Sequence, residues 1–229
     1  MKPLAEATLP LDFHQGDALA ALGMRGTGKT TLVKEMYKAN MAAYDEVCGY
    51  VIDSNAAGDF TGWAGGYVGY TPPIIHATER GRQVVWQPPK DDYAAYEDFF
   101  DRLFEATMQT GVGAVVLIDE LSCLGHGEHR SYARLLKRGR RRRNFPGISV
   151  YSISQEFAQK ADVPRQTFSQ MTHFVRFYVQ HPYDVQESNK LLHLPLHAQP
   201  EHQHGFWAVR LDKPPLRPHY YSGLQEVFA

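Results

Sequence analysis

The segment Gly23–Thr30 (GMRGTGKT) holds residues whose types and spacing point to phosphate chemistry. It fits the pattern G-x-x-x-x-G-K-[ST], in which glycines let backbone N–H groups approach a phosphate that a Cβ would block. The ammonium of Lys29 can reach the β- and γ-phosphates of a nucleotide, and the Thr30 hydroxyl can ligate Mg²⁺. The residues predicted to bind the nucleotide are Gly23, Met24, Arg25, Gly26, Thr27, Gly28, Lys29, Thr30 and Thr31.

Two acids follow an apolar run farther along the chain. The run Ala114–Ile118 (AVVLI) is typical of a buried strand, and Asp119 and Glu120 come directly after it. At the edge of a sheet, beside the phosphate loop, Asp119 can hold Mg²⁺ directly or through water. Glu120 can orient an attacking water and take its proton. Motor-type ATPases usually have this second acid, whereas kinases and switch GTPases do not require it. The alternative is a strand that simply ends in solvated carboxylates.

Gln155 stands at the end of the next apolar run, 147–154 (GISVYSIS). An amide in this position can hydrogen-bond the γ-phosphate or the attacking water and so report whether the phosphate is present. A capping or loop glutamine is the alternative, and the spacing favours neither strongly.

The run Lys137–Arg143 concentrates cations in a chain whose net charge is only −1. One of these arginines could act as a finger in a neighbouring subunit, because a guanidinium stabilises charge on the phosphoryl group being transferred. The run could also bind nucleic-acid phosphates, or it could be a solvated helix end. Arg165 and Arg176 are further candidates for a trans or sensor arginine.

The guanine-reading order Asn-Lys-x-Asp is absent, since Asn189-Lys190 is followed by two leucines. We therefore expect the nucleotide to be ATP, bound with Mg²⁺.

Two further sets of residues resemble metal ligands, but neither has a fourth ligand at a standard zinc spacing. They are Cys123, His126 and His129, and His193, His197, His202 and His204.

These residues have to be positioned by alternating strands and helices. Apolar runs predict strands at 17–22, 46–53, 83–87, 114–120, 147–154 and 172–179. Helical spacing predicts helices at 31–40, 93–110, 128–143 and 184–192, the second with its apolar side at Tyr96, Phe99, Phe100, Leu103, Phe104 and Met108. The alternation predicts an α/β fold with a mostly parallel central sheet, helices on both faces and a closing antiparallel hairpin.

The sequence predicts a single domain over residues 1–229, with a lead-in strand and turn at 1–16 and a C-terminal hairpin and tail at 204–229. Segment 54–73 is rich in glycine and is expected to be an exposed loop. Its aromatic residues could stack on nucleic acid, contact another subunit or pack on the surface, and we favour a packing or contact role; they are Phe60, Trp63, Tyr67 and Tyr70.

Composition narrows the class of protein further. The 229 residues include only two cysteines, Cys48 and Cys123, so a disulfide framework is not expected and a reducing compartment is the simpler interpretation. The N-terminus lacks the apolar core of a signal peptide, and no apolar run approaches the ~18 residues that a membrane span needs.

The order of these motifs resembles the FtsK/HerA superfamily of DNA-pumping ATPases. The resemblance covers residues 17–211 and rests on the phosphate loop and the following segments: Val51-Ile-Asp53, QVVWQPP at 83–89, VVLIDE at 115–120, Gly139-Arg140, ISQ at 153–155 and the segment 164–184. The small size is most similar to the genome-packaging ATPases of tailless viruses with an internal membrane. One departure is that four arginines follow Gly139, where the family usually has a single Gly-Arg-basic step.

The resemblance implies a RecA-like P-loop ATPase that forms a homo-oligomeric ring, expected to be a hexamer. It implies translocation of double-stranded DNA into a preformed capsid, with a capsid vertex protein as partner and a location in the host cytoplasm or on the virion. In this scheme Lys29, Thr30 and Thr31 bind nucleotide and Mg²⁺. Glu120 is the catalytic acid and Gln155 is the sensor. The trans arginine would come from the four-residue run that begins at Arg140 and ends at Arg143.

Three alternatives remain open at the level of sequence. One is a filamentous-phage assembly ATPase, although those usually carry a membrane segment. Another is a nucleotide-regulated DNA-binding scaffold without productive turnover, against which the pair Asp119 and Glu120 argues. The last is a small-molecule P-loop kinase, whose lid arginines the run at 138–143 could mimic.

Overall fold

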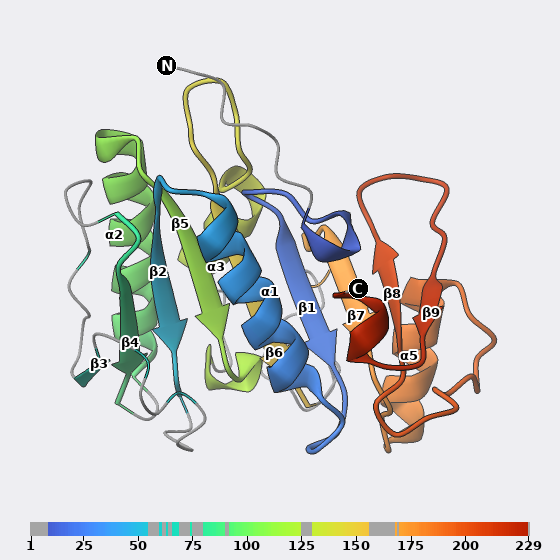
Figure 1. Ribbon diagram of the computed structural model, residues 1–229. Helices are drawn as coiled ribbons and strands as arrows, with labels where there is room; N and C mark the ends of the chain where they lie inside the picture. Colours follow the sequence, from blue (N-terminus) through green and yellow to red (C-terminus); the bar gives the residue numbers. More distant parts are fainter. Residues whose placement is uncertain are drawn as a thin grey trace.

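A nine-stranded sheet organises the part of the chain that the computed structural model describes (Figure 1). The described residues are 9–54, 60, 63, 66–68, 74, 80–89, 92–124, 130–155, 168 and 170–228. The strands lie in the order β3-β4-β2-β5-β6-β1-β7-β8-β9. They are β1 (Ala18–Leu22), β2 (Val47–Ile52), β3 (Gly66–Val68), β4 (Gln83–Gln87), β5 (Gly113–Ile118), β6 (Ile148–Ser154), β7 (His173–Arg176), β8 (Phe206–Arg210) and β9 (His219–Tyr221).

Helices cover both faces of this sheet. Helix α1 (Lys29–Ala43) lies on the face that is in front in Figure 1, and α2 (Tyr93–Thr110) and α3 (Arg130–Arg138) lie on the other face. Helix α5 (Pro182–Leu192) packs beside β8, and short 3-10 helices stand at Pro10–Asp12, Leu121–Leu124 (η3) and Leu224–Glu226 (η4). Among the described residues, no helix has both the length and the apolar character of a membrane-spanning segment.

Strands β1 and β5 carry no polar side chains because both of their faces are buried, whereas β6 between them holds three buried serines. In β5, Val115 and Leu117 face the α1 side, whereas Val116 and Ile118 face the α2–α3 side. The lack of alternation between apolar and polar residues in such a strand is typical of parallel strands that are buried on both faces. The predicted parallel α/β architecture with a closing antiparallel hairpin is therefore confirmed.

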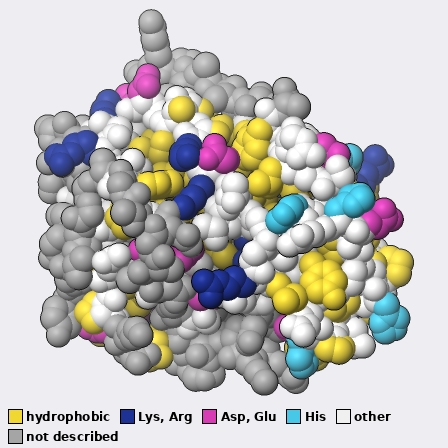
Figure 2. Space-filling model, turned by 60° about the horizontal axis from the view of Figure 1, so that its bottom comes forward, with side chains coloured by type: hydrophobic (Ala, Val, Ile, Leu, Met, Phe, Trp, Pro, Cys, Tyr) yellow, Lys and Arg dark blue, Asp and Glu magenta, His cyan; other side chains and the backbone are white. Residues whose placement is uncertain are grey.

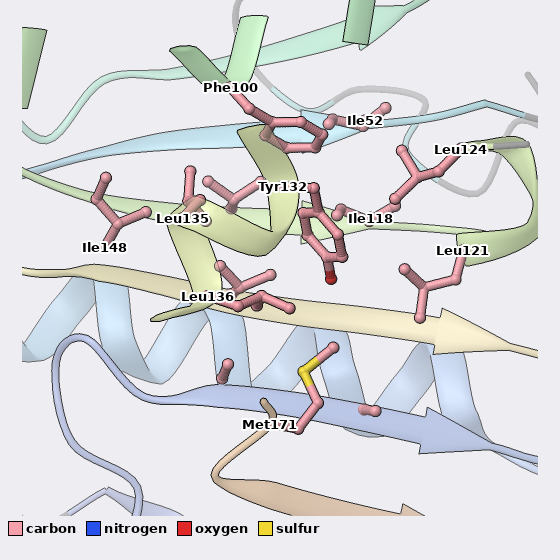
Figure 3. Packing of buried hydrophobic residues seen from close by; sticks show 14 of the residues in the cluster. Ile52, Phe100, Ile118, Leu121, Leu124, Tyr132, Leu135, Leu136, Ile148 and Met171 are labelled. Atoms are coloured by element: carbon pink, nitrogen blue, oxygen red, sulfur yellow. The ribbon is translucent and has the colours of Figure 1, made fainter. Parts of the chain in front are cut away.

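The packing on the α2–α3 face links the helices to the strands that carry the site (Figure 3). The rings of Phe100 and Tyr132 lie against each other, with centroids 5.1 Å apart, next to Ile118 of β5. The hydroxyl of Tyr132 shares a hydrogen bond of 2.8 Å with Ser152 of β6, so its burial leaves no unpaired polar group there. This contact joins α3 to the strand that ends beside Gln155.

The strand order determines which loops meet. Strands β1, β6 and β5 are parallel neighbours, with Leu22 opposite Ser154 and Ile118 opposite Ser152. Their carboxyl ends therefore open at the same edge of the sheet. Strand β6 lies between the strand of the phosphate loop and the strand of the two acids, so the residue that follows β6 emerges between them.

Most predicted elements are confirmed, with boundaries that shift by a few residues. The strand at 83–87 and the helix at 93–110 have the bounds expected from the sequence. In that helix Met108 is 56% exposed, so its assignment to the apolar side is wrong; Thr107 is buried in its place. The expected loop at 54–73 contains the short strand β3, which pairs with β4. Where the lead-in strand was expected, residues 10–12 form a 3-10 helix.

The helix expected to carry the arginine run ends before it. Helix α3 ends at Arg138, and the carbonyl of Gly139 accepts a hydrogen bond of 2.7 Å from Ile148 N at the start of β6. Glycine is a poor helix former, and the carbonyl of this glycine is already paired with the first residue of β6. The arginines 140–143 therefore lie in a loop, where Arg142 and Phe145 exchange backbone hydrogen bonds across a tight turn.

The aromatic residues of segment 54–73 are described only in part. Phe60 is buried and Trp63 is half-buried, and their rings lie edge-to-face against each other beside α1. The Lys34 ammonium of α1 lies 4.4 Å from the centroid of the Phe60 ring. These contacts support the packing role for these two residues; the side chain of Tyr67, and Tyr70 altogether, lie outside the described residues.

We predict that Gly16→Ala destabilises the protein by about 2–5 kcal/mol, as measured by urea denaturation. Gly16 has φ of +92°, and a Cβ there would overlap the backbone nitrogen of Arg141, so the substitution combines backbone strain with displacement of the arginine loop. Gly81→Ala is the matched control, because Gly81 has φ of +75° but open space around a Cβ. It should cost only about 1–2 kcal/mol. Equal losses for the two variants would contradict the packing argument.

Candidate nucleotide-binding site

The phosphate loop joins β1 to α1 and leaves the first turn of α1 open. Gly28 precedes the helix with φ of +101°, and no side chain caps the helix start there. The first intrahelical hydrogen bond runs from Leu32 N to Gly28 O (3.0 Å), so the helix itself does not use the preceding N–H groups. These N–H groups and the helix dipole favour an anion at this end of α1.

Lys29 is buried inside the loop and bound to it. Its side chain is 5% exposed, and its ammonium donates a hydrogen bond of 2.6 Å to the carbonyl of Met24. The Thr27 hydroxyl donates to the same carbonyl at 2.8 Å. Burial lowers the pKa of Lys29 from 10.5 to about 8, against the opposing attraction of Glu120 and Asp119. A phosphate would provide the negative charge that this buried ammonium needs.

The two acids follow β5 and face the same hollow. Asp119 and Glu120 are 7% and 6% exposed. The carboxylate of Glu120 accepts hydrogen bonds from Ser122 N (3.3 Å) and from the Gln155 amide Nε2 (3.2 Å). Burial raises the pKa of Glu120, and these hydrogen bonds and Lys29 oppose the rise. A carboxylate with a raised pKa is a stronger proton acceptor, as a general base requires.

Gln155 lies between Glu120 and the phosphate loop. It follows β6, which lies between β1 and β5, so its amide reaches Glu120 on one side while its side chain lines the pocket of the loop on the other. The position expected from the sequence is therefore the one that Gln155 occupies, and its hydrogen bond orients the Glu120 carboxylate.

A cavity of about 830 Å³ gathers the predicted residues at the carboxyl edge of the strands. Figure 2 looks onto this edge, where basic and acidic side chains lie near the middle and histidines gather on the side of the C-terminal hairpin. The residues that line the cavity are Arg25, Gly26, Gly28, Lys29, Thr30, Thr31, Asp119, Glu120, Ile153, Gln155, His204 and Leu224.

The lining fits a nucleotide with Mg²⁺. Thr30 and Asp119 offer a hydroxyl and a carboxylate, the hard oxygen ligands that Mg²⁺ prefers, and phosphate oxygens and water would complete its shell. Of the other predicted binding residues, Met24 and Thr27 act behind the lining, where the Met24 carbonyl anchors Lys29. Gly23 packs against Phe177 with no room for a Cβ.

Sequence reasoning missed three residues of this cavity: Ile153 of β6, and two residues from the end of the chain. His204 and Leu224 belong to the C-terminal part of the chain, far from the phosphate loop in sequence. The His204 ring lies with its Nδ1 3.3 Å from the carbonyl of Thr27. No local motif marks either residue, and only the return of the chain through β8 and β9 brings them to the loop.

The arginine loop, residues 140–143, lies at the opposite end of the parallel strands from the cavity. Residues 140–143 precede β6, whereas Gln155 follows it, and a strand of seven residues separates the two ends by roughly 23 Å. There they line a hollow of about 720 Å³ together with Arg210 and Lys213. Arg140 and Arg143 are thus not brought into the pocket of their own subunit. Their role in a neighbour's site stays a prediction.

Arg176, the other described candidate for a trans or sensor arginine, is fully buried. It is 0% exposed, donates hydrogen bonds to the carbonyl of Ala198 (2.8 Å) and to Gln199 (3.2 Å), and lies 5.0 Å from the Trp207 ring centroid. Burial lowers its pKa from 12.5 to about 10. These contacts contradict a trans role, because the guanidinium is enclosed within its own subunit. Arg165 lies outside the described residues.

The predicted metal-like triplet is not covered by the structure, since the side chain of Cys123, and His126 and His129 altogether, lie outside the described residues. Over the part of the chain that is described, no group of three or more His, Cys, Asp or Glu side chains is arranged to hold a metal ion.

Comparison with known proteins establishes similarity at the level of fold. No protein-family model and no curated protein sequence matches this chain. Among solved structures, the genome-packaging NTPase B204 from Sulfolobus turreted icosahedral virus 2, in complex with ATP-gammaS, aligns with a TM-score of 0.66 and 15% identity. The alignment covers 89% of this chain and 97% of B204.

Two larger proteins share the fold. The conjugation coupling protein TcpA of pCW3 aligns with a TM-score of 0.58 and 13% identity, over 100% of this chain and 69% of TcpA. The cytoplasmic domain of the type VII secretion ATPase EccC from Thermomonospora curvata aligns with a TM-score of 0.57 and 14% identity, over 96% of this chain and 28% of EccC. The predicted P-loop NTPase fold is confirmed, and these neighbours agree with the resemblance that the motif order indicated.

We predict that nucleotide binding takes up a proton in alkaline solution. The pKa of Lys29 is about 8 without nucleotide, and a bound phosphate favours its charged form and raises that pKa. Between pH 8 and about 10 the site must therefore gain up to one proton on binding, and the affinity falls as the pH rises. Calorimetry near pH 9 (~1 unit above this pKa), in buffers of different ionisation enthalpy, measures the uptake.

Lys38→Met serves as the control for this measurement, because Lys38 is an exposed residue of α1 paired with Glu35. Proton uptake should persist in it. A binding enthalpy that does not depend on the buffer in the unmodified protein would contradict the assignment to Lys29.

Proposed function

We propose that this chain is an ATPase that couples hydrolysis of ATP to the movement of double-stranded DNA, and that it packages a viral genome into a preformed capsid. The observation that carries the proposal is the convergence of Lys29, Glu120 and Gln155 on one cavity beside an open helix start. A scaffold that only binds nucleotide has no need of a second, buried acid with a raised pKa.

The side chains have distinct parts in hydrolysis. Lys29 and the N–H groups of the loop hold the β- and γ-phosphates and stabilise the charge that develops during transfer. Glu120 accepts the proton of the attacking water, while the Gln155 amide keeps its carboxylate in position. Mg²⁺, held by Thr30 and Asp119 when bound, supplies positive charge next to the phosphate oxygens.

The fold supports double-stranded DNA as the molecule that ATP hydrolysis moves. B204 is a genome-packaging NTPase by its description, and the present chain covers 97% of its length. TcpA is described as a conjugation coupling protein. The common fold supports a DNA-translocating ATPase in general, and the narrower role in viral packaging rests on the motif order and on the size shared with B204.

The site is proposed to be completed by a neighbouring subunit. The arginine loop lies at the edge opposite to the pocket, so it can serve a nucleotide only in another subunit. We therefore propose a homo-oligomeric ring, expected to be a hexamer, that works at a capsid vertex protein in the host cytoplasm or on the virion.

The first experiment is steady-state ATP hydrolysis with and without linear double-stranded DNA. Hydrolysis should be stimulated by the duplex, and Glu120→Gln should lower turnover by about 10²–10⁴-fold while ATP binding persists, because only the proton acceptor is lost. Glu105→Gln, on α2 and outside the cavity, is the matched control and should keep the activity. Unchanged turnover in Glu120→Gln would remove its catalytic role, and tight ATP binding without turnover would favour the scaffold.

A mixing experiment tests the trans arginine. Arg140 is paired with Asp212 of its own subunit at 3.3 Å, so Arg143 is the better candidate of the two. Arg143→Ala should be inactive alone. An equal mixture with Glu120→Gln subunits should regain about a quarter of the activity, since half of the subunits supply Glu120 and half of their neighbours supply Arg143.

Arg102→Ala is the control for this mixture, because Arg102 is an exposed residue of α2 paired with Asp98. It should be active alone. Absence of regained activity with Arg143→Ala, and equally with variants of the other three arginines of the loop, would move the trans arginine elsewhere in the chain.

A further inference from the structure

The cavity of the phosphate loop has a wall that phosphate chemistry does not use. His204 precedes β8, and Leu224 begins the 3-10 helix η4 after β9. Both line the same cavity as Lys29 and Glu120. A histidine and a leucine contributed by the end of the chain are not required to hold a triphosphate or to activate a water.

The sheet order places this wall opposite the acids. Strands β6 and β5 lie on one side of β1, whereas β7, β8 and β9 lie on the other. Asp119 and Glu120 follow β5, and His204 and Leu224 adjoin β8 and β9. The phosphate loop therefore stands between the catalytic acid and the C-terminal wall.

This order gives the bound nucleotide a direction, which rests on the proposed function. Glu120 must be at the γ-phosphate, because the attacking water arrives there. The nucleotide then extends away from the acid, so its ribose and base lie toward β7, β8 and β9. The two residues of the cavity that stand on that side and are not part of the phosphate loop or α1 are His204 and Leu224.

The chemistry of the two side chains suits a flat heterocycle. A carbonyl oxygen only accepts hydrogen bonds, so the contact of 3.3 Å with Thr27 O assigns the proton to Nδ1 of His204 and ties the ring to the phosphate loop. The ring itself is exposed, and Leu224 presents a half-buried aliphatic side chain. An aromatic face and an apolar side chain are the partners that a purine base needs, because its own faces are apolar.

We propose that His204 and Leu224 form the subsite for the purine base of the nucleotide. The phosphate loop binds the phosphates, and the C-terminal wall adds affinity through stacking and apolar contact. Because every purine has the same kind of face, this contact strengthens binding without reading the edge of the base.

The test compares ATP with inorganic tripolyphosphate, which has the same phosphates and no base, both with Mg²⁺. His204→Ala and Leu224→Ala should each weaken ATP binding by about tenfold and leave tripolyphosphate binding unchanged. His204→Phe keeps an aromatic face and should retain most of the ATP affinity. Calorimetry on the full chain gives both dissociation constants.

Two exposed residues of the same region serve as matched controls. His197→Ala and Leu196→Ala alter exposed side chains outside the cavity and should change neither constant. An ATP-to-tripolyphosphate affinity ratio that stays within about twofold in the His204 and Leu224 variants would overturn the subsite. Failure of the unmodified protein to bind either ligand, or binding that survives Lys29→Ala, would instead overturn the proposed function.

Discussion

The parallel register of β1, β6 and β5 is the constraint on which the candidate site depends. Because Leu22 stands opposite Ser154, and Ser152 opposite Ile118, the residues that follow the three strands leave the sheet at one edge. A shift of one residue would turn every side chain of a strand to the other face and disrupt the close packing of the layers on both sides of the sheet. The side chains of these strands pack against the layers on the two faces of the sheet, and the polar residues of the site stand in the loops beyond the strand ends.

The site buries charged side chains, and their burial opposes folding. Lys29, Asp119 and Glu120 are almost fully buried, and removal of charged groups from water costs free energy that ion pairing only partly recovers. Burial accordingly lowers the pKa of Lys29 and raises that of Glu120. Apolar residues of similar size would stabilise such a pocket better. This cost is understandable if a nucleotide supplies the missing negative charge next to Lys29 and the Glu120 carboxylate accepts a proton from a water molecule.

Local chemistry made much of the site predictable from sequence. Lys29 and Glu120 belong to short motifs whose neighbours set their conformation, and the apolar runs predict the strands before them. The remainder depends on contacts that no local pattern records. Helical spacing alone did not show that Gly139 would leave α3 for the edge of the sheet, or that Met108 would face water. His204 reaches the cavity only through the antiparallel return of β8 beside β7, which is a property of the tertiary fold.

Strand β8 runs from the end of the sheet that holds the nucleotide cavity to the end that holds the arginine loop. It runs antiparallel to β7, so His204 before it lies at the nucleotide cavity, while Arg210 at its end lies at the arginine loop. Asp212, just beyond β8, binds Arg210 at 2.9 Å and Arg140 at 3.3 Å, and these ion pairs fix the loop to the strand. A contact that presents the loop to a neighbour's pocket joins two different surfaces, and such head-to-tail contacts close into rings when their rotation permits. In such a ring each subunit would offer an arginine loop whose position β8 relates directly to that subunit's own nucleotide cavity.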